Sequence, residues 1–200
     1  MTSPSSDLTT GYPVTHDRSP LKICLIVGEA SGDALGAPLM AALVAEVRQR
    51  YPGRVITFCG VGGDLMVREG LESFFPASDL AVMGLVEIIP HIPRILNRLA
   101  VAERLIQAEK PHVVVTIDAP GFAFRLARRL RRRSLGIPMI HYTAPTVWAW
   151  RSGRAAKIAG LYDHLLCLFP FEPPYFTRWG LDATYVGHPL LERIPYTPPR

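Results

Sequence analysis

Residues 113–118 constrain the fold more than any other stretch of this chain. Their sequence is Val-Val-Val-Thr-Ile-Asp, in which four residues are β-branched hydrocarbons, and a turn at residues 119–122 follows. Such a run is typical of a strand buried on both faces of a parallel sheet. Open α/β sheets bind ligands just beyond the carboxyl ends of their strands, so Asp118 is a candidate for chemistry. An aspartate at this position could equally cap the helix that follows.

Further segments predict that this strand belongs to a larger parallel sheet. Residues 22–27 and 54–59 are apolar, strand-like runs that end at glycines, and leucines at helical spacing lie between them. A right-handed crossover is the expected connection in such a β-α-β unit. Further strands are expected at residues 137–142, at 164–169 and near residue 185. The sequence therefore predicts an α/β fold, a Rossmann-like parallel sheet with helices on both faces.

The turn after the first strand is not a dinucleotide-binding loop. Gly28, Gly32 and Gly36 are spaced four apart, whereas that loop needs G-x-G-x-x-G. Glu29 would repel a phosphate there, but it can accept hydrogen bonds from sugar hydroxyls or amides, with Ser31 as a nearby donor. The plainer alternative is that Ser31 or Asp33 caps the helix that follows.

Residues 80–108 combine a helical apolar stripe with two prolines. Pro90 and Pro93 are expected to kink or break the first part, because proline lacks a backbone donor and crowds the preceding turn. Residues 99–106 fit a helix that faces the core. Residues 86–96 fit either the same helix or a segment that dips into a membrane interface, because the segment is densely apolar and has Arg94 and Arg98 beside its apolar side chains.

The net charge of +5 indicates anionic partners: phosphates, acidic lipid or nucleic acid. Six arginines lie within residues 125–133, on a helix whose apolar stripe is Phe122, Leu126 and Leu130. This cationic face is either simply solvated or placed against anionic phospholipid. No RNA-binding or helix-turn-helix pattern accompanies it, so nucleic acid is not an expected partner.

The cysteines and the N-terminal sequence predict a protein inside the cell. Cys24, Cys59 and Cys167 lie in apolar runs without metal spacing, which predicts reduced core residues. The N-terminus lacks a signal pattern, and no run of about 18 apolar residues predicts a membrane-spanning helix. Residues 1–20 are rich in Ser, Thr and Pro and are expected to form a disordered tail.

Aromatic side chains gather near the end of the strand at residues 137–142. His141 lies at that end, and Trp148, Trp150 and Arg151 follow in a loop or short helix. Core packing accounts for one tryptophan. Two beside an arginine suggest a ligand wall or an interfacial anchor.

Several of these pieces occur together in one family. They are residues 28–33, 80–87, 117–122, 141–151, 169–172 and 187–189, in unbroken order. Through them the chain, from residue 22 to 192, resembles the amino-terminal half of lipid-A-disaccharide synthase. This resemblance implies the N-terminal domain of a two-domain GT-B glycosyltransferase, here residues 21–193.

The resemblance implies an inverting transferase that joins UDP-2,3-diacylglucosamine to 2,3-diacylglucosamine 1-phosphate and releases UDP. Asp118 matches the general base that takes the proton of the acceptor's 6-hydroxyl. The implied substrate-binding positions are Glu29, Ser31, Met83, His141, Trp148 and Arg151. The implied membrane patch consists of Val86, Ile88, Ile89, Ile92, Ile95 and Leu96. No D-x-D pair is present, so no metal or other cofactor is expected.

The same resemblance predicts a protein attached to the cytoplasmic side of the inner membrane. The family continues into a second, UDP-binding domain and forms homodimers in some members. Residues 194–200 are expected to begin the linker, with that domain absent from this chain. The 200 residues alone are therefore expected to have no transferase activity. The alternative is a non-catalytic peripheral lipid-binding module.

Overall fold

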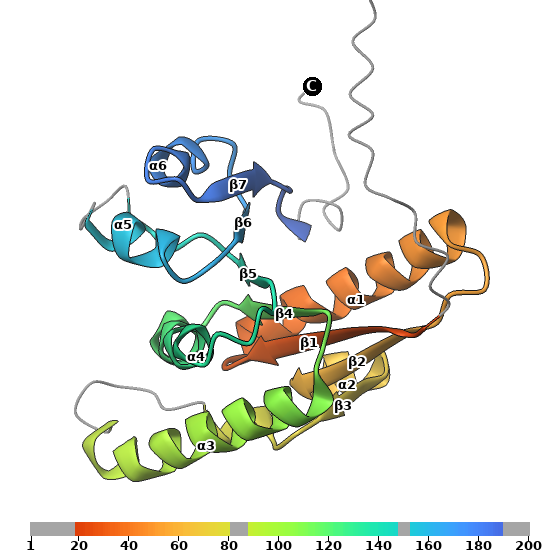
Figure 1. Ribbon diagram of the computed structural model, residues 1–200, viewed down its shortest axis with the longest axis horizontal. Coiled ribbons are helices and arrows are strands. Elements are labelled where there is room, and N and C mark those ends of the chain that lie inside the picture. The colour runs from red at the N-terminus through yellow and green to blue at the C-terminus, as the bar shows by residue number, and fades with distance from the viewer. Residues whose placement is uncertain (1–18, 81–87, 148–152, 190–200) are drawn as a thin grey trace, which may run out of the picture.

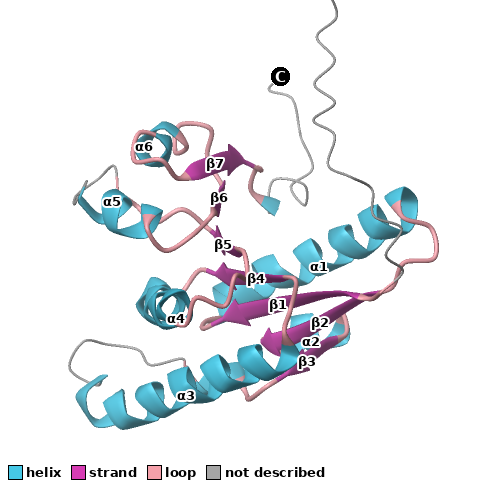
Figure 2. Ribbon diagram, in the orientation of Figure 1, coloured by secondary structure: helices cyan, strands magenta, loops and turns pink. Residues whose placement is uncertain are grey.

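A computed structural model of the chain describes residues 19–80, 88–147 and 153–189, and Figure 1 and Figure 2 show these as one sheet between two layers of helices. The elements are β1 (Leu21–Val27), α1 (Ala30–Arg50), β2 (Ile56–Val61), α2 (Asp64–Arg68), β3 (Leu71–Ser73), the 3-10 helix η1 (Ala77–Asp79), α3 (Ile88–Glu109), β4 (Val113–Ile117), α4 (Pro120–Arg132), β5 (Met139–Tyr142), α5 (Gly153–Ala159), β6 (His164–Cys167), α6 (Pro174–Thr177) and β7 (Asp182–Tyr185). The strands are ordered β3-β2-β1-β4-β5-β6-β7, and all neighbours are parallel. The predicted Rossmann-like sheet is confirmed.

The alternation of side chains along β1 builds two cores. Ile23, Leu25 and Val27 point to one face, where they pack with α1 and α2. Cys24 and Ile26 point to the other face, where α3, α4, α5 and α6 cover the sheet. Both faces are therefore buried, which explains the uninterrupted apolar runs of the central strands.

Glycines near the end of β1 permit close packing. A Cβ on Gly28 would lie 2.7 Å from the Cβ of Ala119, and one on Gly32 would lie 3.1 Å from the carbonyl oxygen of Ile117. Gly28 and Gly32 thus let β1, α1 and the end of β4 approach one another. This close packing explains why glycines occur at these two positions, whereas a phosphate-binding loop does not.

Helix α3 differs from the sequence prediction. It runs from Ile88 to Glu109 with Pro93 inside it, so the expected break at the prolines is wrong. Pro90 is the third residue of the helix, where the backbone N–H has no intrahelical partner to lose. Leu99, Ala102 and Ile106 are fully buried, as predicted.

Helix α1 also departs from the expectation that no helix could cross a membrane. By length and composition alone, Ala30–Arg50 is long and apolar enough to do so. In the structure, however, Gly32, Met40 and Val47 are buried against the sheet and α2. We therefore interpret α1 as a layer helix of the domain, because the core helices of such domains share this composition.

Strand β2 extends two residues beyond its predicted end because Gly60 fits inside it. Gly60 has a φ of +140°, and a Cβ there would overlap the carbonyl oxygen of Leu25 on β1. The register pairs Leu25 with Gly60 directly. A side chain at this position would therefore push the two strands apart.

We expect Gly60→Ala to lower the free energy of unfolding by more than about 2 kcal/mol, since strain and backbone overlap act together. Urea denaturation measures the change. Gly121→Ala in α4 is the matched control, because its Cβ would meet nothing within 4 Å. Equal stability of the two variants would show that the approach of β2 to β1 does not require glycine.

Candidate functional site

Two loops meet at the carboxyl ends of β1 and β4. The register pairs Val27 with Ile117, so the residues that follow each strand emerge side by side. There the Ser31 hydroxyl donates a 2.7 Å hydrogen bond to Oδ2 of Asp118. A bond to one carboxylate oxygen orients the group and leaves the other able to accept from a ligand. Sequence reasoning placed both residues at this edge, and the structure brings them into contact.

The backbone at Asp118 is held in a sparsely populated conformation. Asp118 and Ala119 both have left-handed φ angles, 54° and 46°, and the Asp118 N–H donates to the carbonyl oxygen of Tyr142 at 2.6 Å. Consecutive non-glycine residues in this region cost on the order of 1–3 kcal/mol each. Helix α4 begins at Pro120 with Ala119 as its N-cap and without a side-chain cap. The alternative that Asp118 caps this helix is therefore wrong.

Asp33 caps a different helix from the one the sequence suggested. Its carboxylate accepts hydrogen bonds of 3.0–3.1 Å from the backbone N–H groups of Gly63, Leu65 and Met66, at the start of α2. Helix α1 has Glu29 at its N-cap position and no side-chain cap bond. Asp33 thus ties α2 to α1, while Glu29 and Ser31 remain exposed at the sheet edge.

A buried polar chain leads to the same edge. The Thr116 hydroxyl donates to the Tyr162 hydroxyl at 3.0 Å and lies 2.7 Å from Nδ1 of His141. Burial lowers the pKa of His141 to about 4, although the nearby Asp118 opposes this shift. His141 is thus neutral near pH 7 and brings no charge to this edge of the sheet.

Asp118 and His141 share a small polar pocket. Its volume is about 220 Å³, and its wall also contains Thr143, Thr146 and Arg154. This volume is below the range usual for drug-sized ligands, and it fits a single sugar ring. Sequence reasoning missed Arg154, whose only signal was its place three residues after Arg151.

A much larger hollow lies on the other side of the loop after β1. It has a volume of about 1120 Å³, borders the ends of β1, β2 and β3, and includes Glu29 in its wall. Most of its other lining residues are apolar or small.

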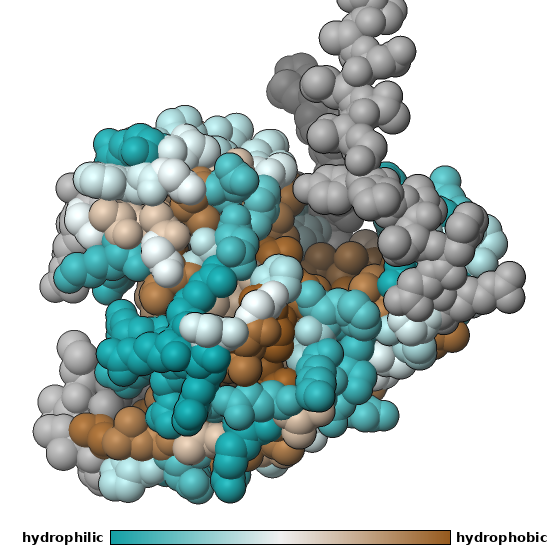
Figure 3. Space-filling model, in the orientation of Figure 1, coloured by the Kyte–Doolittle hydropathy of each residue, from teal (hydrophilic) through white to brown (hydrophobic). Residues whose placement is uncertain are grey.

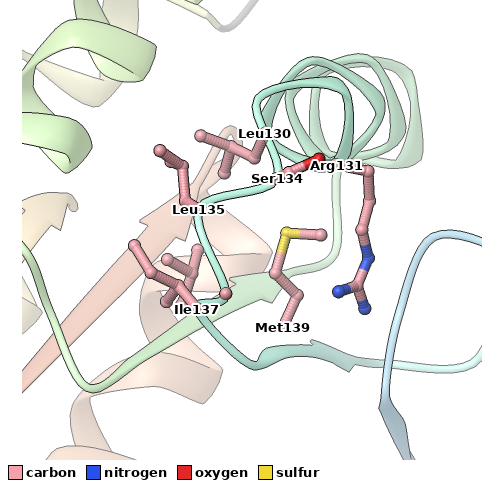
Figure 4. Close-up of a pocket in the computed structure, with 8 residues that line it drawn as sticks. Leu130, Arg131, Ser134, Leu135, Ile137 and Met139 are labelled. Atoms are coloured by element: carbon pink, nitrogen blue, oxygen red, sulfur yellow. The ribbon is translucent and has the colours of Figure 1, made fainter.

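A third cavity, of about 350 Å³, lies at the opposite, amino-terminal edge of the sheet. Figure 4 shows Leu130, Leu135 and Met139 around it, with Arg131 at its side. Arg131 already pairs with Asp163 and donates to the carbonyl oxygen of Leu161. This cavity is therefore remote from Asp118 and Glu29, and the charged side chain in its wall, Arg131, is already paired.

The exposed surface of α3 carries part of the predicted membrane patch. Ile92 and Leu96 are 43% and 51% exposed, whereas Ile95 is half-buried against the core. The side chains of Ile88 and Ile89, at the start of the helix, lie outside the described part of the structure. Four other predicted residues, Val86, Met83, Trp148 and Arg151, also lie outside it, as do the tail up to residue 18 and residues 190–200.

The arginines of residues 125–133 differ in their partners. Arg129 and Arg133 both bind the buried carboxylate of Glu103 on α3, at 2.7 and 2.6 Å. Burial opposes the shift, but the two guanidinium groups hold the pKa of Glu103 below its ordinary value. Arg125, Arg128 and Arg132 are exposed. In Figure 3 the hydrophilic surface over α4 borders a hydrophobic stripe along α3.

We expect the neutral state of His141 to make the domain acid-sensitive. Its pKa is about 4 when folded and about 6.5 when unfolded, so the unfolded chain binds the proton first as the pH falls. The contribution of neutral His141 to the free energy of unfolding is fully present above pH 6.5, and roughly 3 kcal/mol of it is lost by pH 4. Urea denaturation across this range should show a steeper loss for the wild type than for His141→Gln. Parallel curves would contradict the buried neutral imidazole.

Known proteins share both the sequence and the fold. The family model described as Lipid-A-disaccharide synthetase matches residues 23–200. Lipid-A-disaccharide synthase of Rhodospirillum centenum is 54% identical over 173 residues, covering 86% of this chain and 42% of the relative. The Xanthomonas oryzae protein of that name is 45% identical over 203 residues, covering 97% of this chain and 45% of the relative. The chain thus spans less than half the length of these relatives.

A solved structure supports the fold independently. The co-structure of Staphylococcus aureus MnaA with UDP aligns with a TM-score of 0.53 and 16% identity, over 80% of this chain and 42% of that one. At this identity the likeness concerns the fold alone.

Proposed function

This chain belongs to the lipid-A-disaccharide synthetase family, and we propose that it forms the acceptor-side half of a transferase that builds lipid A disaccharide. The reaction joins the 6-hydroxyl of 2,3-diacylglucosamine 1-phosphate to the anomeric carbon of UDP-2,3-diacylglucosamine. UDP leaves as that bond forms, with inversion at the anomeric carbon.

The bond between Ser31 and Asp118 carries this proposal. The Asp118 carboxylate lies in the wall of a pocket of one-ring size, and Ser31 fixes its orientation. A carboxylate so held can accept the proton of the acceptor's hydroxyl as that oxygen attacks the donor sugar. Arg154 in the same wall supplies the positive charge for the acceptor phosphate, and neutral His141 offers a ring nitrogen for a hydrogen bond with the sugar.

The activity test uses a chimera that joins residues 1–200 to the remaining part of the Rhodospirillum centenum relative. Asp118→Asn in this protein should lower the rate of disaccharide formation about 100-fold or more, by general-base magnitudes. Asparagine suits the test because it tolerates the left-handed backbone at this position. A variant with a near-wild-type rate would remove Asp118 from the chemistry. A folded chimera that binds both substrates but forms no product would favour the non-catalytic lipid-binding module.

We also assign α3 to peripheral contact with the inner membrane, at its cytoplasmic surface. Ile92 and Leu96 expose apolar side chains on one side of the helix, and the exposed arginines of α4 lie beside it. Apolar side chains that enter the headgroup region, together with cations that meet anionic lipid, are the usual basis of reversible attachment.

We expect Ile92→Ser with Leu96→Ser to weaken sedimentation with anionic phospholipid vesicles at least tenfold while the melting temperature stays within about 2 °C, because both side chains are exposed. Ile95→Ser is the matched control: it replaces a half-buried core contact, so it should lower stability by about 1–2 kcal/mol and leave vesicle binding intact. Equal vesicle binding by the double variant and the wild type would exclude this surface.

A further inference from the structure

We propose that the large hollow at the ends of β1, β2 and β3 is a groove for the acyl chains of the acceptor. This inference rests on the proposed function, because it takes a diacylated sugar phosphate as the ligand of the Asp118 pocket. It adds a binding site to that function, and it places the two parts of the ligand on the two sides of the loop after β1.

The groove has an apolar wall that the described residues leave partly exposed. Leu65 and Val67 project from α2 and are 44% and 49% exposed. Partly buried Phe74 and buried Phe75, which follow β3, complete the apolar part of the lining. Exposed apolar side chains that gather at a hollow of this size are typical of a binding site. Its volume of about 1120 Å³ greatly exceeds the need of one sugar ring.

Strand order places the groove and the polar pocket on one continuous edge. Glu29 belongs to the groove wall, and Ser31, two residues later, is bonded to Asp118 in the pocket wall. The pocket is small and lined mostly by polar residues. The groove is larger, and its lining combines an apolar side formed by Leu65, Val67, Phe74 and Phe75 with the charged residues Glu29, Asp33, Asp64 and Arg68. An amphiphile whose ring reaches Asp118 therefore has room for its hydrocarbon chains across the loop after β1.

Ion pairs hold the segment after β3, which lines the groove, against α3, the helix that we assign to the membrane surface. Asp79 in η1 forms ion pairs with Arg94 and Arg98 of α3, and the Arg98 guanidinium lies 4.9 Å from the centre of the Phe75 ring. The segment that lines the groove is thus held against α3, whose exposed Ile92 lies further toward its start. This arrangement favours an occupant that comes from a lipid surface over a peptide or a soluble cofactor.

Burial of hydrocarbon predicts how affinity depends on chain length. Each methylene transferred from water into an apolar site tightens binding about fourfold. We therefore expect the dissociation constant to fall steeply from the dibutyryl to the dihexanoyl form of 2,3-diacylglucosamine 1-phosphate. Glucosamine 1-phosphate, which has no acyl chains, should bind weakly through the polar pocket alone.

Isothermal titration calorimetry of the 200-residue chain with these three soluble probes is the test. Leu65→Ser with Val67→Ser should reduce the effect of each added methylene to less than twofold and leave the weak binding of glucosamine 1-phosphate unchanged. The matched control is Leu135→Ser with Val55→Ser, because these side chains are also exposed but lie at the opposite edge of the sheet. This control should retain the wild-type dependence on chain length.

The outcomes separate the groove from the function it extends. In one outcome the acylated probes bind, Asp118→Asn weakens their binding, and the double variant at Leu65 and Val67 keeps the wild-type dependence on chain length. That outcome overturns the groove proposal and leaves the proposed function standing. If no probe binds the wild-type chain, both fail together. A chain-length dependence lost only in the Leu65 and Val67 variant supports the groove.

Discussion

The close approach of the loops after β1 and β4 is the constraint on which the rest of the site depends. Gly28 has no side chain where Ala119 comes within contact distance, and Gly32 lies against the end of β4. Only this spacing brings Ser31 within 2.7 Å of Asp118. A parallel sheet whose strand order reverses between β1 and β4 creates a crevice at this position, and the glycines narrow it until two side chains can share one hydrogen bond.

Buried charge fastens the layers around this crevice. Glu103 on α3 binds Arg129 of α4 and Arg133 just after that helix, and Asp79 binds Arg94 and Arg98 of α3. A buried carboxylate without a cationic partner would destabilise the fold. A buried carboxylate that is paired with arginines instead fixes one helix against its neighbour. The arginine-rich helix, at first sight only a basic surface, therefore uses part of its charge inside the fold.

The sequence predicted the regular features and missed those that depend on pairs of distant residues. The buried strand ending at Asp118 and the stripe of Phe122, Leu126 and Leu130 follow from local patterns, and both are confirmed. The partner of Asp33 lies some thirty residues away at the start of α2, and no periodicity reveals it. The passage of α3 through Pro93 likewise depends on packing, which overrides the local cost of proline.

The central claim is that the Asp118 carboxylate receives the acceptor's 6-hydroxyl. Its most direct measurement is a structure of this chain with 2,3-diacylglucosamine 1-phosphate bound. The account predicts the 6-hydroxyl oxygen about 2.6–3.2 Å from an Asp118 carboxylate oxygen, with Ser31 still bonded to the other oxygen. A ligand whose 6-hydroxyl faces solvent, or whose phosphate occupies the place beside Asp118, would contradict it.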